Sequence, residues 1–140
     1  MHAKLQAIAE FWAARRPDGR LPSHRRFPPE DLKPWLGHVC LVAVERPSLR
    51  LLLRLVGSQV VQYDGRDYTG RYFDDIVAAE HRDAALAPYR ESLRTGQPVG
   101  DIRPYIGPDA TIARIHRLVL PCAEDGQTID VFLAALYDER

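Results

Sequence analysis

The stretch LRLLLRLVGSQVVQYDGRDYTGRYFDD, residues 49–75, begins with the pattern of a β-strand and then loses it. Leu49, Leu51, Leu53 and Leu55 recur at every second position, the period of a strand with one buried face. The alternation stops at Gly57, and residues 58–63 fit a short helical turn. Glycines among tyrosines and acids then mark a loop. The segment therefore predicts a strand, a short helix and a glycine turn, in that order.

Four further segments have strand character. Residues 39–44 are wholly apolar, and the short turn ERPS joins them to the strand at 49–56, which predicts an antiparallel hairpin. Three more strands are expected at 99–106, 111–122 and 128–137. The Asp-Gly pair of EDGQ, between the last two, is typical of a hairpin. The sequence thus predicts five antiparallel strands.

Residues 73–98 interrupt the strands with a mostly helical pattern. Their apolar stripe consists of Leu86, Tyr89 and Leu93. Pro88 is expected to kink this helix or to begin its second part, because proline lacks a backbone N–H. Asp74 or Asp75 suits the N-cap before IVAAEHRDA. The segment predicts a helical crossing between the second and third strands.

The N-terminal 38 residues are expected to form a separate layer before a core domain at 39–140. Residues 4–16 form an amphipathic helix with a stripe of Leu5, Ile8, Phe11 and Trp12. This stripe has two interpretations: it covers a face of its own sheet, or it is a surface for a second copy or a partner. Residues 20–38 form a proline-rich arm, with a short helical turn from Pro29. Its side chains in need of cover are Phe27, Leu32, Trp35 and Leu36.

Composition limits the classes of function. The 140 residues are 46% hydrophobic and 27% charged, which is typical of one soluble globular domain. Nineteen basic residues balance nineteen acidic ones, so net charge gives no sign of nucleic-acid binding. Without a signal peptide or membrane span, a cytoplasmic location is expected. Cys40 and Cys122 are expected to be free, buried thiols.

Together the order β-β-α-α-β-β-β and the segment RLVGSQVVQYDGRDYTGRYFDDI resemble a PAS domain. The expected fold is therefore an α+β, five-stranded antiparallel sheet with a helical crossing on one face. A narrower resemblance is to stand-alone, single-domain bacterial PAS proteins, carried by LPSHRRFPPEDLKPWLGHV, YRESLRTGQPV and LVLPCAEDGQTIDVFLAALY. The resemblance explains why the strand stops at Gly57: the chain leaves the sheet and crosses its face.

The resemblance implies a sensory or protein-interaction module without catalysis. PAS domains bind small molecules between the inner sheet face and the helical crossing, and signal through dimerisation or a separate signalling protein, so a homodimer is expected here. The hypothetical pocket consists of Leu53, Leu55, Tyr63, Phe73, Leu86, Tyr89, Leu118, Leu120 and Leu133. An error of one residue in a strand would place its members on the outer surface instead.

Cofactors of related photosensors and haem proteins can be compared residue by residue. The photoreactive cysteine of flavin-binding relatives stands where GRYF places Phe73, so flavin adduct chemistry is not expected. The haem-ligating histidine would fall near Ala85, and His81 lies one turn earlier, so a haem-binding PAS sensor is only an alternative. The histidines are scattered without a metal-ligand spacing, so no metal is expected.

An enzyme is the other alternative. The acids Asp64, Asp67, Asp74, Asp75 and Glu80 cluster in one stretch, and a buried carboxyl with a raised pKa can transfer protons, as in an isomerase or hydrolase. Neighbouring hydrogen-bond donors are Tyr63, Tyr68 and Tyr72. Acids beside glycines are more often turn formers and caps, which favours a binding module.

A basic run lies between the first helix and the arm. It contains Arg15, Arg16, Arg20, Arg25 and Arg26. Such a run suits a nucleotide messenger, a phosphate or an acidic partner helix, although a solvated loop is the commoner explanation. Nucleic acid is not expected, because no aromatic platform or recognition helix accompanies the charge.

Overall fold

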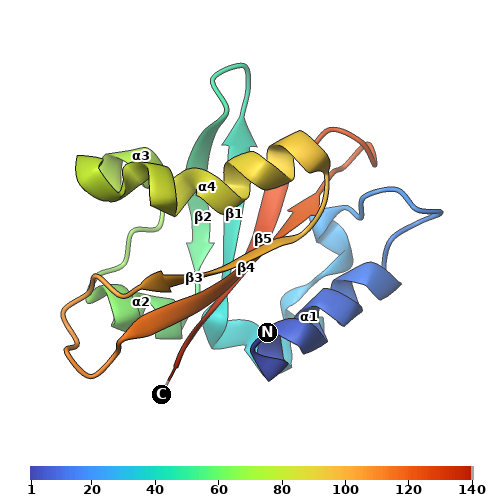
Figure 1. Ribbon diagram of the computed structural model, residues 1–140. Helices are drawn as coiled ribbons and strands as arrows, with labels where there is room; N and C mark the ends of the chain where they lie inside the picture. The colour runs from blue at the N-terminus through green and yellow to red at the C-terminus, as the bar shows by residue number, and fades with distance from the viewer. Residues whose placement is uncertain (140) are drawn as a thin grey trace.

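Five antiparallel strands form the sheet at the centre of the molecule (Figure 1). A computed structural model describes residues 1–139. The strand order is β2-β1-β5-β4-β3, which confirms the predicted five-stranded sheet. The strands are β1 (Val39–Glu45), β2 (Arg50–Val56), β3 (Val99–Pro104), β4 (Arg114–Cys122) and β5 (Val131–Asp138). The last three begin or end a few residues away from their predicted bounds.

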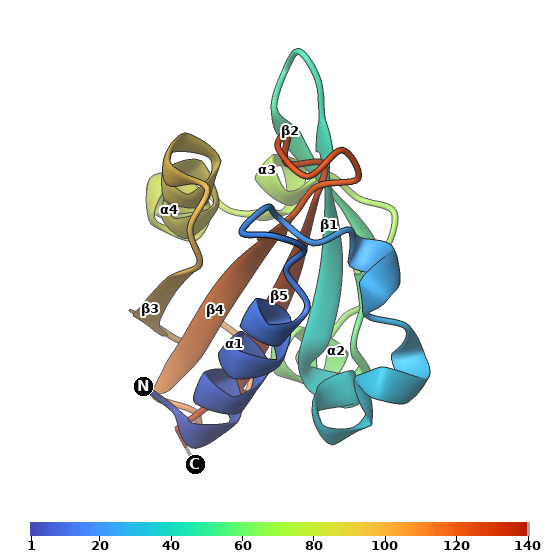
Figure 2. The same cartoon turned by 90° about the vertical axis from the view of Figure 1, so that its right-hand side faces the viewer.

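Helices cover both faces of this sheet (Figure 2). On the inner face lie α2 (Ser58–Asp64), α3 (Phe73–Ile76) and α4 (Ala79–Thr95). On the outer face lie α1 (Ala3–Ala14) and an arm with three short 3-10 turns, η1 (His24–Arg26), η2 (Pro29–Asp31) and η3 (Lys33–His38). None of the helices within residues 1–139 combines the length and the apolar character that a membrane crossing requires.

The apolar stripe of α1 packs on the chain's own sheet. Leu5, Ile8 and Trp12 are at most 2% exposed, and the Trp12 indole N–H donates to the Pro121 carbonyl at 3.0 Å. Phe11 is partly buried between the rings of Phe27 and Trp35. The side chains of the stripe therefore already have apolar neighbours within the chain, which favours the intramolecular interpretation. A contact of the stripe with a second copy or a partner stays a prediction.

The arm fulfils its expected role as a wrapping segment. Phe27, Leu32 and Trp35 are buried in the same apolar core as α1, whereas Leu36 is 43% exposed. The Trp35 indole N–H donates to the Lys4 carbonyl at 3.0 Å, which joins the arm to α1. Residues 1–38 thus share one continuous core with the sheet.

A β-bulge in β2 breaks the alternation that the leucines suggest. Val42 pairs with Leu53 and Leu41 pairs with Leu55, so Arg54 is an extra residue without a partner across the ladder. Beyond it the faces are exchanged, so Val56 points to the inner face. Leu55 consequently lies on the outer face and is 43% exposed.

The predicted helical segment at 73–98 divides into two helices. Asp74 and Asp75 belong to α3 and do not cap the following helix. Both carboxylates contact the Arg50 guanidinium, at 3.1 and 3.0 Å, and this guanidinium also lies 3.9 Å from the centre of the Tyr72 ring. These contacts hold α3 against the edge strand β2.

Pro88 lies inside α4, where it leaves the Ala84 carbonyl without its usual N–H donor four residues later. The Arg117 side chain, from β4, supplies donors at this point: it bonds the Ala85 carbonyl at 2.8 Å and the Ala84 carbonyl at 3.3 Å. The same guanidinium makes a two-bond pair with Asp101 of β3, at 3.0 and 2.8 Å. Arg117 is 2% exposed, so one buried cation joins α4, β3 and β4.

The strand ends at Gly57 because the backbone there passes very close to the end of the arm. A Cβ atom at Gly57 would lie 2.4 Å from the Gly37 carbonyl oxygen and 2.8 Å from that of Val39. Both neighbours are backbone atoms, which cannot move aside as a side chain could. Only glycine therefore allows the chain to turn from β2 into α2 at this crossing.

Gly57→Ala is expected to lower the free energy of unfolding by about 1–3 kcal/mol, because the added methyl group forces two backbone segments apart. Gly100→Ala is the matched control, since a Cβ there has its nearest neighbour at 3.5 Å. Urea titration of both variants measures the difference. Equal stability of the two variants would contradict the close approach.

Asp101→Val is expected to cost about 3 kcal/mol or more of unfolding free energy, because it leaves the buried Arg117 charge without its carboxylate. The double variant Asp101→Val, Arg117→Met should lose less than Asp101→Val alone. Arg114→Met is the surface control on the same strand, with an expected cost of about 0–1 kcal/mol. A double variant as unstable as the sum of the two single variants would show that the pair is not coupled.

Candidate functional site

A cavity of about 350 Å³ lies between the inner face of the sheet and helices α2–α4. This volume is at the small end of ligand pockets, which span about 300–1,000 Å³. Its wall is mostly apolar and includes Leu53, Val56, Val60, Tyr68, Phe73, Ile76, Tyr89 and Leu136. The position is the one expected from the sequence, between the sheet and the helical crossing.

Four of the nine predicted pocket residues form part of this wall: Leu53, Tyr63, Phe73 and Tyr89. Leu86 lies on a different side of α4 from the cavity, and it lines a second hollow between α4 and the start of β2. Whether the four wall residues contact a ligand stays a prediction.

The other four predicted residues lie on the opposite face of the sheet. Leu118 and Leu120 are two and four residues after His116 on β4, so their side chains lie on the same face of the sheet as His116. The His116 ring contacts His2 at the start of the α1 layer. Leu133 pairs with Leu120 and therefore shares that face, and Leu55 is turned outward by the bulge. These strands are buried on both faces, so alternation of polar and apolar residues could not identify the inner one.

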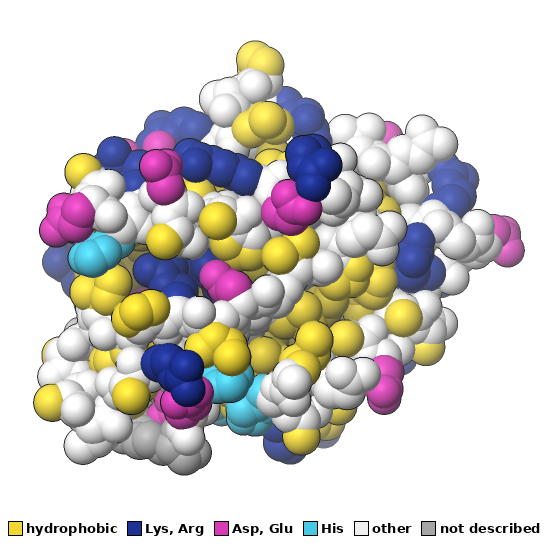
Figure 3. All heavy atoms as spheres, in the orientation of Figure 1, with side chains coloured by type: hydrophobic (Ala, Val, Ile, Leu, Met, Phe, Trp, Pro, Cys, Tyr) yellow, Lys and Arg dark blue, Asp and Glu magenta, His cyan; other side chains and the backbone are white. Residues whose placement is uncertain are grey.

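Polar groups gather at one side of the cavity. Arg103 comes from β3, Asp64 from the end of α2, and His81 from the first turn of α4. In Figure 3, dark-blue basic side chains lie in a hollow below α4, surrounded by hydrophobic ones. His81, which the sequence suggested to be a solvated helix residue, is partly exposed and also belongs to the wall. The cavity therefore has an apolar body and a charged side.

Arg103 is a partly buried cation for which the described part of the chain provides no ion-pair partner. No carboxylate among residues 1–139 lies within 4 Å of its guanidinium, and Asp101, on the same strand face, is bound to Arg117. Burial lowers the pKa of Arg103, and the positive charge of Arg117 lowers it further. Sequence reasoning missed Arg103, because an arginine on an edge strand is most often solvated.

Asp64 faces the same region from the C-terminal end of α2. Partial burial raises the pKa of this carboxyl to about 6, against an opposing effect from the Arg103 charge. The negative end of the α2 dipole also disfavours a carboxylate at this position. Asp64 thus changes its charge close to neutral pH, next to Arg103.

The positions that correspond to the flavin-adduct cysteine and the haem-ligating histidine of relatives differ in where they lie. Phe73, at the position of a photoreactive cysteine, lies in the wall and cannot form a thiol adduct. Cys40 of β1 also lies in the wall, but burial raises the pKa of its thiol to about 12, so the thiol stays protonated. Ala85, near the expected haem-ligand position, is fully buried.

Three histidines that are far apart in the sequence meet behind the cavity. His38 stacks on the Tyr137 ring at 3.8 Å, and His2 stacks on the same ring at 4.8 Å. His2 also meets His116 edge-on at 5.7 Å. Tyr63, from the cavity wall, contacts His38 Nδ1 through its hydroxyl at 3.4 Å. Within residues 1–139 no such group has the arrangement of a metal site.

The acids of the enzyme alternative do not form one cluster. Asp74 and Asp75 pair with Arg50, and Asp67 accepts hydrogen bonds from the backbone N–H and hydroxyl of Thr69. Asp64 alone of these acids lies in the cavity wall. Of the tyrosines, Tyr63 and Tyr68 line the cavity, whereas the Tyr72 hydroxyl donates to Glu45.

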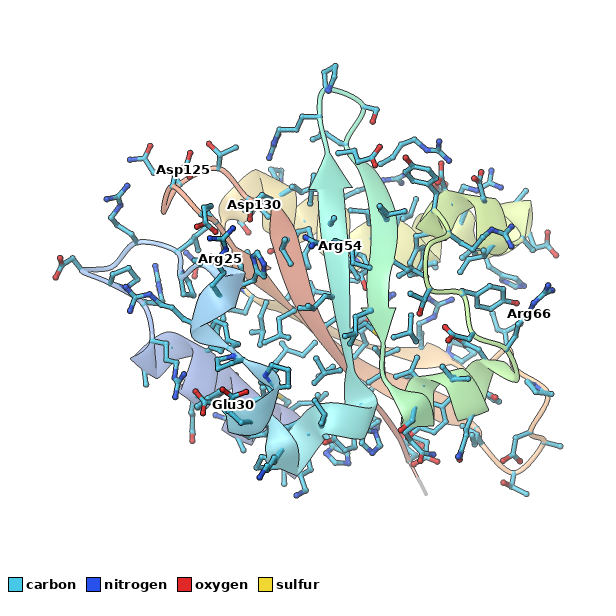
Figure 4. The ribbon with its side chains drawn as sticks, turned by 180° about the vertical axis from the view of Figure 1, so that it is seen from behind. Arg25, Glu30, Arg54, Arg66, Asp125 and Asp130 are labelled. Atoms are coloured by element: carbon cyan, nitrogen blue, oxygen red, sulfur yellow. The ribbon has the colours of Figure 1, made fainter. Side chains whose placement is uncertain are left out.

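The basic run is used mainly to fasten the arm. Arg15 pairs with Asp31 at 2.7 Å, and Arg16 and Arg20 donate to backbone carbonyls. Arg25 lies 3.7 Å from Glu124, beside the turn between β4 and β5 (Figure 4). Several arginines of the run, which suited an anion or a solvated loop, are therefore engaged in contacts within the chain.

The sequence profile of the PAS domain family matches residues 1–136. The chain belongs to the PAS domain family. The short sequence segments that resembled a PAS domain are thus part of a match over almost the whole sequence. No curated protein matches this PAS domain.

Solved structures resemble this PAS domain at low sequence identity. A sensory box sensor histidine kinase from Vibrio cholerae has a TM-score of 0.58 and 15% identity, with 100% of this chain and 99% of that chain covered. The Rhodobacter sphaeroides LOV protein has a TM-score of 0.53 and 14% identity, covering 99% and 69%. The PAS domain of a Colwellia psychrerythraea protein has a TM-score of 0.53 and 10% identity, covering 78% and 93%. These likenesses show the fold.

Asp64→Asn is expected to change how the stability of this PAS domain depends on pH. Because the folded protein holds the Asp64 proton up to a pKa of about 6, above the ordinary 3.8, the wild type loses stability as pH rises between these values. The variant lacks this loss and gains stability relative to wild type at pH 7. Urea unfolding at pH 4.5 and 7 measures it.

Asp83→Asn, at an exposed carboxyl of α4, is the control for this experiment. It should show the same pH dependence as the wild type. An Asp64→Asn variant with an unchanged profile would mean that the carboxyl is fully solvated.

Proposed function

We propose that this PAS domain is a sensory module that binds a small, largely apolar molecule in its cavity. The observation that carries the proposal is the cavity itself: an apolar space of about 350 Å³ with a few polar groups on one side. Pockets of this kind, with few convergent polar groups, are the usual form of small-molecule sites. The sensory role follows from membership of the PAS domain family.

Binding in the cavity has a route of contacts to the outer layer. A ligand would touch Tyr63, whose hydroxyl reaches His38 at 3.4 Å. His38 stacks on Tyr137, which in turn stacks on His2. The His2 ring also accepts the Lys4 backbone N–H at the start of α1. We therefore propose that a signal reaches a partner protein or a second copy through the outer layer around α1.

The apolar stripe of α1 is not itself the output surface in this proposal, because it is buried. A displacement of His2 or of the arm would instead change which outer side chains are accessible. Large apolar residues already exposed on this side include Met1, Ile102, Leu36 and Leu55. Homodimerisation through this region stays a prediction.

A variant that fills the cavity should abolish binding of a neutral apolar probe. Val77 lines the cavity and is partly exposed, so Val77→Phe adds a ring to the space with little change to the core. We expect N-phenyl-1-naphthylamine to bind the wild type with enhanced fluorescence, and to bind Val77→Phe at least tenfold more weakly.

Leu55→Phe is the matched control, since it also introduces a phenyl ring, but on the outer face. It should leave probe affinity unchanged. Native mass spectrometry of freshly purified wild type, before and after denaturation, complements the titration by detecting a retained molecule. Failure of the probe to bind the wild type, together with no retained molecule, would reject the cavity as a binding site.

A further inference from the structure

We infer that the cavity selects an organic acid: an apolar molecule with one carboxylate, which pairs with Arg103. This inference rests on the proposed function of the cavity and names the class of its ligand. It starts from the placement of two arginines, Arg103 and Arg117, on the inner face at the β3–β4 edge of the sheet.

The two arginines share one carboxylate on their sheet face, and its bonds go to only one of them. Asp101 accepts two bonds from Arg117, and two further donors of Arg117 reach the Ala84 and Ala85 carbonyls. Four of the five N–H donors of Arg117 are thus engaged in holding the fold. Arg103, two residues after Asp101 on the same strand face, lines the cavity, and no carboxylate of residues 1–139 lies within 4 Å of its guanidinium. Among the described residues, Arg103 is therefore a cation of the wall whose guanidinium is not in contact with a carboxylate.

A partly desolvated guanidinium gains most from a carboxylate, because the two planar groups match in two parallel hydrogen bonds. The rest of the wall favours an apolar body for the same ligand. Phe73, Tyr89 and Leu53 contribute apolar surface to the same space. A molecule with one acidic group and a hydrocarbon or aromatic part satisfies both requirements.

The groups around Arg103 favour a single negative charge. Asp64 of α2 faces the same region, and when ionised it would repel a second negative charge. His81 of α4, Tyr105 after β3 and Cys40 of β1 complete the polar side of the wall. Among these groups only Arg103 and Arg117 are permanent cations, and Arg117 is already paired. A phosphate dianion would find too few donors here.

The test uses two eight-carbon probes that differ in charge, octanoate and 1-octanol. Isothermal titration calorimetry of the full chain at pH 7 is expected to show octanoate binding at least tenfold more tightly than 1-octanol. Arg103→Gln should weaken octanoate by at least tenfold and leave 1-octanol within twofold. Arg103→Lys should recover only part of the octanoate affinity, because an ammonium group lacks the two-bond geometry.

Arg54→Gln is the matched control. Arg54 is an exposed arginine at the bulge of β2 (Figure 4), and its replacement should change neither affinity. A second control is the pH dependence: octanoate should bind more tightly at pH 5.8 than at pH 7.5, since protonation of Asp64 removes its repulsion, and Asp64→Asn should remove this difference.

Two results would overturn the inference: equal affinity of the wild type for octanoate and 1-octanol, or equal loss of both probes in Arg103→Gln. The comparison of the two probes on the wild type needs no variant to fold. These failures differ from failure of the proposed function. If N-phenyl-1-naphthylamine binds and Val77→Phe prevents it, the cavity is a binding site even when it shows no preference for the acid.

Discussion

The buried guanidinium of Arg117 is the contact on which the arrangement of the inner face depends. Pro88 would leave a carbonyl of α4 without a donor in the interior, and Arg117 supplies donors at that point. The two-bond pair with Asp101 offsets the cost of burying this cation. The Arg117 side chain therefore joins β3, β4 and α4 through hydrogen bonds. Tyr89 lies beside the same cation, with its ring centre 5.6 Å from Arg117 Cζ.

This contact also decides the character of the cavity. Since Arg117 takes both oxygens of Asp101, the neighbouring Arg103 lines the wall without a contacting carboxylate among residues 1–139. Asp64 faces the same region from α2, and its partial burial raises the pKa of its carboxyl to about 6. The site proposed for ligands is thus a by-product of the structural pair: the fold uses one arginine of the edge and leaves the other available.

The parts of the fold that depend on local pattern could be predicted from the sequence. The five strands, the stop at Gly57 and the wrapping arm follow from residue periodicity, glycines and prolines. The cavity was predicted less well. Leu53, Tyr63, Phe73 and Tyr89 line it, but Leu118, Leu120 and Leu133 face α1, since a strand with two apolar faces has no polar residue to mark its orientation. The bulge at Arg54 places Leu55 on the opposite face of the sheet from Leu53, although the regular spacing of the leucines predicts one shared face.

The sequence by itself determined that this chain is a PAS domain, because order and spacing of the elements are local properties that survive at low identity. The tertiary structure alone decided which side chains share a space. His2, His38 and Tyr137 come from three distant segments and stack together in the fold. The burial of Arg117 likewise depends on Asp101 of another strand, and this pairing leaves Arg103 without that carboxylate. Such contacts depend on register and burial, which single residues do not encode, and they are the contacts from which a binding site is made.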